Sequence, residues 1–148
     1  MTTFLEGMQQ DLEALLPDEA ETIVAHAREV RRSFMGSDRE TRFKAARYAV
    51  IALAAGAAYS IVRNAGLSDI GACETAGNVV ALAAQAVNGC RSDRLAAQVL
   101  ARIAPQLSRY GINQKRGALN EEDILTVRGL NSWADAHGIP VYEPAYER

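Results

Sequence analysis

The chain has 148 residues, of which 49% are apolar and 23% are charged, a balance that is typical of a folded, soluble protein. A chain of this length buries roughly two thirds of the surface that its unfolded form exposes, so it needs neither disulfides nor a metal ion to fold. The net charge of −2 predicts no overall attraction to nucleic acid or to a membrane. Any such binding must come from a local patch.

The N-terminal sequence and the cysteines predict a cytoplasmic protein. MTTFLEGMQQDLEALL carries acids and no basic region, so we expect no signal peptide. On one helix Cys73 and Cys90 would lie about 25 Å apart, which is far beyond disulfide reach. We therefore expect two free thiols in a reducing compartment. The uncharged run 48–62 is shorter than the roughly 20 residues of a membrane span, so we predict a buried helix there.

The first two predicted helices precede residue 36. Apolar residues recur at helical spacing up to Pro17, which ends the first helix. Asp18 and Glu21 match a capping box that opens the second helix, and Gly36 is predicted to end it in the left-handed backbone geometry that glycine tolerates. The residues that the second helix is predicted to bury are Ile23, Ala27, Val30 and Phe34.

The third and fourth helices are predicted to lie at the centre of the fold. Ser37 with Glu40 matches a second capping box, Gly66 ends the third helix, and Ser68 caps the fourth. The third helix is apolar nearly all round, as buried helices are, and its thin run 54–58 allows a neighbouring helix to approach closely. The fourth helix, which Gly89 ends, is predicted to bury Ile70, Cys73, Gly77, Val80, Ala84 and Val87.

Two further helices and a tail complete the chain. Ser92 starts the fifth helix, which Pro105 should kink because proline removes a helix hydrogen bond. A polar loop over 111–117 leads to a sixth helix from Asn120 to His137, and the tail 139–148 is expected to be extended. The inward residues of the fifth helix are predicted to be Leu95, Val99, Ile103 and Leu107. With no strand pattern and no linker, the sequence predicts one all-α domain over residues 1–148, a bundle of about six helices with a central apolar hairpin.

No recognised catalytic or metal-binding motif occurs in the sequence. His26 and His137 belong to no zinc pattern, and no nucleophile or phosphate-loop motif is present. Cys73 lies near a helix start, where a thiol pKa can fall, but its predicted inward position favours an inert core residue. We therefore expect neither an enzyme nor a cofactor.

The main functional signal is a separation of charge in the first third of the chain. Residues 1–22 carry six acids and no base, whereas residues 28–47 carry seven bases and three acids. Clustered cations suit a surface that follows nucleic-acid phosphates, and the predicted nucleic-acid-binding residues are Arg28, Arg31, Arg32, Arg39, Arg42, Lys44 and Arg47. Alternatively, this is a solvated helix face whose charges pair with the acidic first helix. Arg47 projects from the apolar side of its helix and either snorkels or meets an acid or a phosphate.

The tripeptide Ser-Asp-Arg occurs twice, at 37–39 and at 92–94, each time at a predicted helix start. Capping chemistry explains this coincidence, so we assign no repeat.

The junction Val62-Arg63-Asn64-Ala65-Gly66-Leu67-Ser68 resembles the "VR-x-x-GL" junction of the small all-helical subunit of type III CRISPR effector complexes. The order of parts is also similar, from a basic helix to a last helix that bears Trp133. The chain departs from that family at Gly71, Ala72 and Cys73, where large apolar residues should follow, and in its acidic first helix. The resemblance implies a non-catalytic bacterial subunit that lies in copies along a ribonucleoprotein and contacts its nucleic-acid strands through a basic surface.

Two functional hypotheses follow. The first is a helical subunit that contacts the backbone of RNA or single-stranded DNA and also contacts other subunits or copies of itself, without a membrane. The second is a protein-only interaction module, such as a homo-oligomer, an inhibitor or a phage-type assembly protein. Two nearly all-apolar helices must be packed against other helices on most sides, and a second copy of the chain could supply some of them. A weaker third idea is a DNA-binding regulator that reads bases through Arg128 and Asn131 of the sixth helix.

Overall fold

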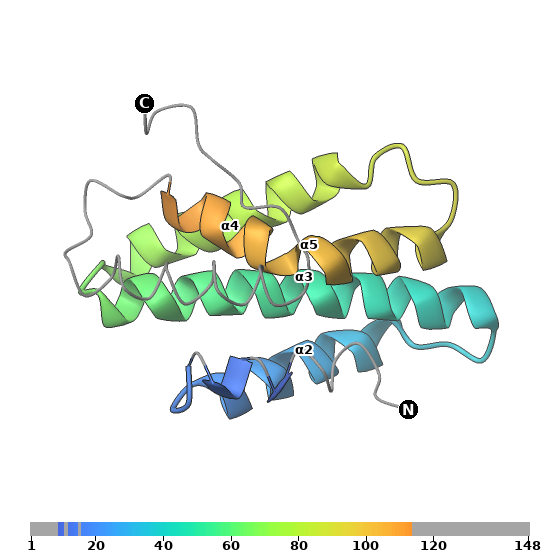
Figure 1. Cartoon of the computed structure of the whole chain (residues 1–148). Coiled ribbons are helices and arrows are strands. Elements are labelled where there is room, and N and C mark those ends of the chain that lie inside the picture. The colour runs from blue at the N-terminus through green and yellow to red at the C-terminus, as the bar shows by residue number, and fades with distance from the viewer. Residues whose placement is uncertain (1–8, 11, 15, 114–148) are drawn as a thin grey trace.

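The computed structural model describes residues 9–10, 12–14 and 16–113, and within them the protein is all-α with no strand (Figure 1). Short helical stretches at 9–10 and 12–14 precede four helices, which are α2 (Ala20–Phe34), α3 (Arg39–Asn64), α4 (Asp69–Ala86) and α5 (Asp93–Asn113). The predicted sixth helix, with Trp133, Arg128 and Asn131, and the predicted tail lie outside the described residues.

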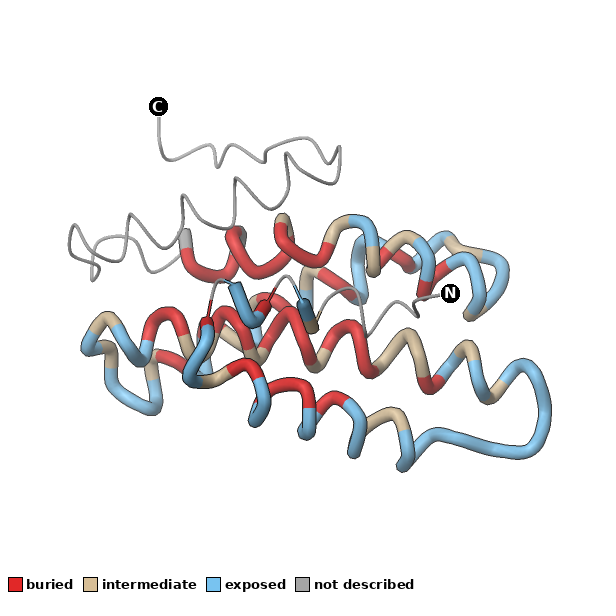
Figure 2. Tube along the Cα trace, turned by 60° about the horizontal axis from the view of Figure 1, so that its bottom comes forward, coloured by how far each residue is buried: buried red, intermediate tan, exposed pale blue. Residues whose placement is uncertain are grey.

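Helix α3 is the centre of the bundle, as its apolar composition predicts. It packs against α2 on one side and against α4 and α5 on the other (Figure 1). Its 18-residue apolar window has the length and hydropathy of a membrane span, but 61% of that window is buried inside the protein. Figure 2 shows buried residues gathered where the helices face one another and exposed residues at the turns. Helix α3 is therefore the core helix of this bundle.

Small residues on α3 allow its neighbours to approach closely. The hydroxyl of Ser108 on α5 donates a buried hydrogen bond of 2.7 Å to the carbonyl oxygen of Ala54. On the α2 side, a Cβ atom added at Gly56 would lie 3.0 Å from Cγ2 of Ile23. The predicted close approach at residues 54–58 is confirmed, and larger side chains there would separate the helices.

Several helix ends lie where the sequence predicts them. Gly66, with φ 92°, ends α3 in the left-handed region. The Gly66 amide donates to the Arg63 carbonyl, and the Leu67 amide donates to the Val62 carbonyl, a pair that defines a Schellman motif. The hydroxyls of Ser68 and Ser92 cap α4 and α5 by accepting hydrogen bonds from the backbone amides three residues further on.

The predicted start of α2 is wrong. Its N-cap is Glu19, and no side chain caps the helix. The reason is that the backbone amides of Glu19 and Ala20 both donate to the carbonyl of Leu16, at 3.3 and 2.9 Å. The preceding turn thus supplies the hydrogen-bond acceptor that the Asp18 side chain was predicted to supply.

Three other ends differ by a few residues. The cap of α3 is Asp38 rather than Ser37, and the Asp38 carboxylate accepts a 2.8 Å hydrogen bond from the Thr41 amide, which lowers the pKa of that carboxyl. Helix α2 stops because Met35 is extended, so Gly36 takes no left-handed geometry. Helix α5 continues through Pro105 and past the predicted loop start at Gly111 to Asn113.

The predicted inward face of α4 is wrong except at Val87. Ile70 is 74% exposed and Val80 is 46% exposed, and Cys73, Gly77 and Ala84 are also exposed. The residues that α4 buries are Ala72, Thr75, Val79 and Ala83. The Thr75 hydroxyl donates to the Gly71 carbonyl, so it enters the core without losing a hydrogen bond. Because apolar residues surround most of this helix, composition alone does not choose its buried side.

Helices α2 and α5 show smaller differences. On α2, Ile23 and Ala27 are buried as predicted, but Phe34 is 41% exposed and stacks on Tyr48 with ring centroids 4.4 Å apart. On α5, Leu107 is buried and Leu95 is 45% exposed. The core of α5 is made by Ala96, Ala97, Leu100, Ala104, Leu107 and Ile112.

Candidate anion-binding end of the bundle

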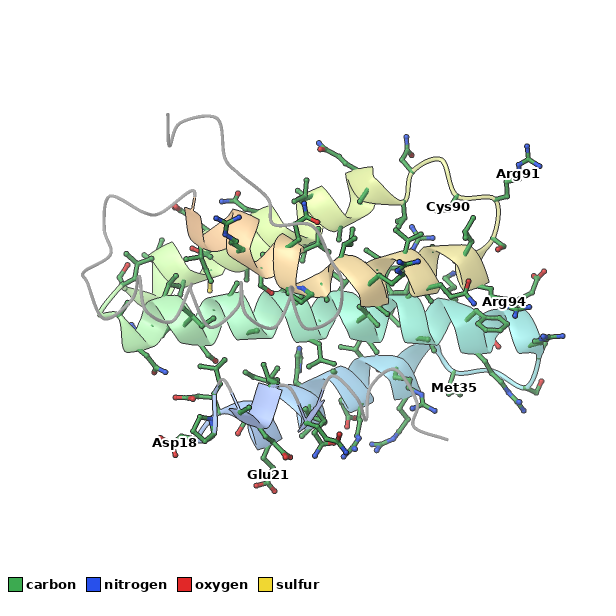
Figure 3. All side chains as sticks on the ribbon, in the orientation of Figure 1. Asp18, Glu21, Met35, Cys90, Arg91 and Arg94 are labelled. Carbon is green, nitrogen blue, oxygen red and sulfur yellow. The ribbon has the colours of Figure 1, made fainter. Side chains whose placement is uncertain are left out.

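Antiparallel packing brings three basic segments to one end of the bundle. These are the C-terminal half of α2, the N-terminal half of α3 and the N-terminus of α5 with the turn before it. Figure 3 shows Met35, Cys90, Arg91 and Arg94 at this end, whereas Asp18 and Glu21 lie at the opposite end of α2. The separation of charge along the sequence is thus a separation of charge along the molecule.

We call this region the basic end. It carries four acids, Glu29, Asp38, Glu40 and Asp93, and nine basic residues, which are Arg28, Arg31, Arg32, Arg39, Arg42, Lys44, Arg47, Arg91 and Arg94. All seven basic residues that the sequence singled out lie here. Arg91 and Arg94 were missed, because they follow α4 in the chain and join the others only through the fold.

One cavity of the basic end, which we call the Phe43 cleft, lies between α3 and the start of α5. Its volume is about 450 Å³, and it is lined by Arg39, Glu40, Phe43, Arg47, Cys90, Arg91, Ser92, Asp93 and Arg94. The guanidinium carbons of Arg39 and Arg94 lie 5.8 and 5.7 Å from the centroid of the Phe43 ring, within cation–π range. The cleft thus joins an aromatic surface to several guanidinium groups.

The two copies of the Ser-Asp-Arg tripeptide lie close together at this cleft. Arg39 and Arg94 are the third residues of the two Ser-Asp-Arg sequences, and both lie over the same ring. The two helix starts are adjacent in space because α3 and α5 run in the same direction. In the sequence, capping alone explains this repetition, and it is the one sequence signal that points to Arg94.

Arg47 is the most enclosed basic residue of the cleft. Its Nη1 donates to Asp93 Oδ1 at 3.1 Å, and its guanidinium carbon lies 5.7 Å from the Tyr48 ring centroid. The side chains of Arg47 and Asp93 are 26% and 32% exposed. Of the alternatives that the sequence left open for Arg47, the structure shows the contact with an acid. Its Nε atom is buried and has no hydrogen-bond partner among the described residues, so one donor of this cation is left unsatisfied.

The start of α5 places a helix N-terminus at the same cleft. Ser92 caps the helix by accepting a 3.2 Å hydrogen bond from the Leu95 amide, and the Ala96 amide donates to the Ser92 carbonyl at 3.1 Å. The positive pole of the helix dipole therefore lies beside Arg91 and Arg94, where it favours an anion.

A second, shallower groove lies on α2. Its volume is about 250 Å³, and it is lined by Arg28, Arg31, Arg32 and Met35. Arg28 donates to the Gln9 amide oxygen at 2.8 Å. Arg32 pairs with Glu29 at 2.9 Å, and both side chains of this pair are more than 60% exposed, so solvent screens the pairing. Arg42 and Lys44 are exposed on α3 and line neither cavity.

These contacts bear on the alternative that the arginines pair with the acidic N-terminal segment. The residue of that segment that Arg28 contacts is an amide, and Gln9 in turn donates to Glu13 at 3.0 Å. Two ion pairs join described side chains, and in both of them the acid belongs to the basic end itself. Within the described ranges the arginine surface is thus not neutralised by the acids of residues 9–21.

Arg63 has a structural role at the junction that the resemblance rests on. Its Nη1 donates to the Leu67 carbonyl at 2.8 Å and so closes the turn between α3 and α4. This turn lies at the end of α3 opposite the basic end. The two cysteines are free, as predicted, but Cys73 is exposed rather than buried.

Comparison with known proteins gives no match to a family model, to a curated protein or to a solved structure.

Proposed function

We propose that the protein is a non-catalytic, cytoplasmic subunit of a larger assembly that contacts the backbone of RNA or single-stranded DNA through its basic end. The observation that carries this proposal is the convergence of nine basic residues and four acids from three separate segments on one end of the bundle. The resemblance of residues 62–68 to the small subunit of type III CRISPR effector complexes supports the same function.

The residue types suit phosphate binding. Arginine presents a planar fork of donors that matches the oxygens of a phosphate. Most of these arginines are exposed, so they bind a strand without prior rearrangement of the core. Since the whole chain has a net charge of −2, the attraction is local and depends on how the molecule is oriented.

Titration of a labelled single strand against salt tests the proposal. Fluorescence anisotropy with an oligouridine of about 20 nucleotides should show an affinity that falls steeply between about 50 and 200 mM salt, with a log–log slope of roughly −0.7 per phosphate contact. Arg28→Ala/Arg31→Ala/Arg32→Ala and Arg91→Ala/Arg94→Ala should each weaken binding and flatten the slope. Arg102→Ala, which removes an exposed arginine further along α5, serves as the control and should bind like the wild type.

Two results would contradict this function. One is the absence of binding at the lowest salt concentration. The other is equal loss of affinity in the Arg102→Ala control and in the basic-end variants, because such a loss would reflect total charge rather than this surface.

A protein-only interaction module is the second candidate function. The exposed face of α4 favours it, because Ile70 and Val80 present large apolar side chains to solvent, as Leu95 of α5 also does. Gly77, Ala81 and Ala84 of α4 are exposed as well. Such a surface suits the close approach of a second copy of the chain.

A further inference from the structure

We propose that the Phe43 cleft binds one nucleotide of a single strand, with its phosphate on the guanidinium groups and its base against the Phe43 ring. This inference rests on the proposed function and adds a site to it. The volume of about 450 Å³ lies within the roughly 300–1,000 Å³ of small-molecule sites. The lining also combines cations with an aromatic ring and a thiol. A phosphate ion would contact only the cations, whereas a nucleotide also contacts the ring through its base.

The phosphate position follows from the donors that remain open. Arg47 is held by Asp93 through Nη1 and its Nε is buried, so the donors open to a phosphate belong to the exposed arginines around it. Arg91 and Arg94 lie beside it at the start of α5, where the helix dipole also favours an anion. The cleft contains the carboxylates of Glu40 and Asp93 as well, so its four arginines retain an excess of two positive charges for the strand.

The base position follows from the Phe43 ring. Phe43 is partly exposed on the cleft side, and the guanidinium groups nearest to it belong to the exposed residues Arg39 and Arg94. A base that enters the cleft stacks on the ring or on a guanidinium plane, and every base has a face that can do so. Because duplex bases are already stacked and paired, the cleft selects single strands.

The two cysteines provide an internal probe of this site. Cys90 lines the cleft and is partly exposed, whereas Cys73 is exposed on the distal half of α4. Alkylation of the full chain with iodoacetamide, read for each cysteine by peptide mass spectrometry, reports on both positions in one sample. We expect a saturating oligothymidine to slow alkylation of Cys90 in proportion to the bound fraction and to leave Cys73 unchanged.

A strand of the same length and charge that lacks bases separates stacking from charge. We expect the abasic strand to bind about tenfold more weakly than oligothymidine, as the loss of one stacked base predicts. We also expect Phe43→Leu to remove most of this difference. Thermal unfolding of Phe43→Leu checks that its fold is kept, and the abasic comparison on the wild-type chain needs no variant.

Failure of this inference is distinguishable from failure of the proposed function. If Cys90 and Cys73 react as in the free protein while the basic-end variants still weaken salt-sensitive binding, the cleft is not the site, and the rest of the basic end is. Equal affinity for the abasic strand would overturn the base position. Protection of Cys90 by thymidine monophosphate alone, at the same nucleotide concentration, would assign the cleft to a free nucleotide instead. No binding of any strand would overturn both proposals.

Discussion

At the scale of single residues, two glycines in this protein have opposite roles. Gly111 lies in α5 against α4, and a Cβ atom added there would lie 2.5 Å from Cγ2 of Val79 and 2.9 Å from the backbone oxygen of Thr75. Gly77 lies on the exposed face of α4, and apart from its chain neighbours and the adjacent backbone of its own helix, no described atom lies within 4 Å of the corresponding position. The same substitution therefore tests packing at one site and backbone entropy at the other.

Gly111→Ala should destabilise the protein by about 1–3 kcal/mol, because the backbone oxygen of Thr75 cannot move aside as a side chain does. Gly77→Ala should stabilise it by roughly 0.5–1 kcal/mol, since alanine is the better residue in an exposed helix. Urea unfolding of the two variants measures both free energies of unfolding. Unchanged or increased stability of Gly111→Ala would show that the close contact between α4 and α5 does not form.

Tyr59 and Asp69 form a contact across the α3–α4 junction that responds to alkaline pH. The Tyr59 hydroxyl donates to the Asp69 carboxylate, and this hydrogen bond raises the pKa of the phenol above its ordinary value of 10.0. A raised pKa means that the folded state favours the neutral phenol. The contact therefore adds stability below about pH 10, and this stability is lost as the pH rises through the folded pKa.

Absorbance titration of the phenolate, taken as the difference between the wild type and Tyr59→Phe, should place the transition of Tyr59 above pH 10. Asp69→Asn should move this transition back toward the ordinary value, because it removes the charged acceptor. An unchanged transition in Asp69→Asn would contradict the contact.

At the scale of elements, α4 has two different faces. Ala72, Thr75, Val79 and Ala83 pack inside the bundle, while the opposite face exposes Ile70 and Val80. Substitutions on the exposed face therefore leave the core intact and report on association.

The protein-only candidate predicts that this face joins two copies of the chain. Ile70→Lys/Val80→Lys should then convert a dimer into a monomer in size-exclusion chromatography with light scattering, because two buried cations would oppose the contact. Ala25→Lys on the exposed side of α2 is the control and should leave the mass unchanged. A wild-type chain that is monomeric at high concentration would remove the support for this candidate.

The sequence predicts the helices of this fold better than their faces. Residues with special backbone or capping chemistry, such as Gly66, Ser68 and Ser92, mark helix ends because the effect is local. The inward side of α4 escapes prediction because it depends on how small residues fit against α3 and α5. In the candidate site, Arg47 and Arg39 follow from charge clustering, whereas Arg91 and Arg94 join them only after the chain reverses twice.

At the scale of the whole molecule, charge is distributed unevenly along the bundle. The chain has a net charge of −2, yet its basic end carries more than twice as many bases as acids. Electrostatic attraction to a polyanion therefore depends on orientation rather than on net charge.

Retention on immobilised heparin tests this distribution near neutral pH, where the net charge is negative. We expect the wild type to bind at low salt and to elute as the salt concentration rises, because about 0.15 M salt already screens exposed charges beyond roughly 8 Å. Arg91→Ala/Arg94→Ala should elute earlier than the wild type. Passage of the wild type through the column without delay would show that the basic end does not attract a polyanion as a single surface.

The position of the basic surface at the tip of the bundle limits how the protein can occupy a strand. Helix α3 has 26 residues, so the described bundle is about 39 Å long at 1.5 Å per residue. A strand held at the basic end contacts only one end of this length. The footprint would then be a few nucleotides, short for a chain of this mass. The exposed face of α4 lies along the side of the bundle and would not contact the strand. Successive copies of the protein could therefore bind next to one another along the strand.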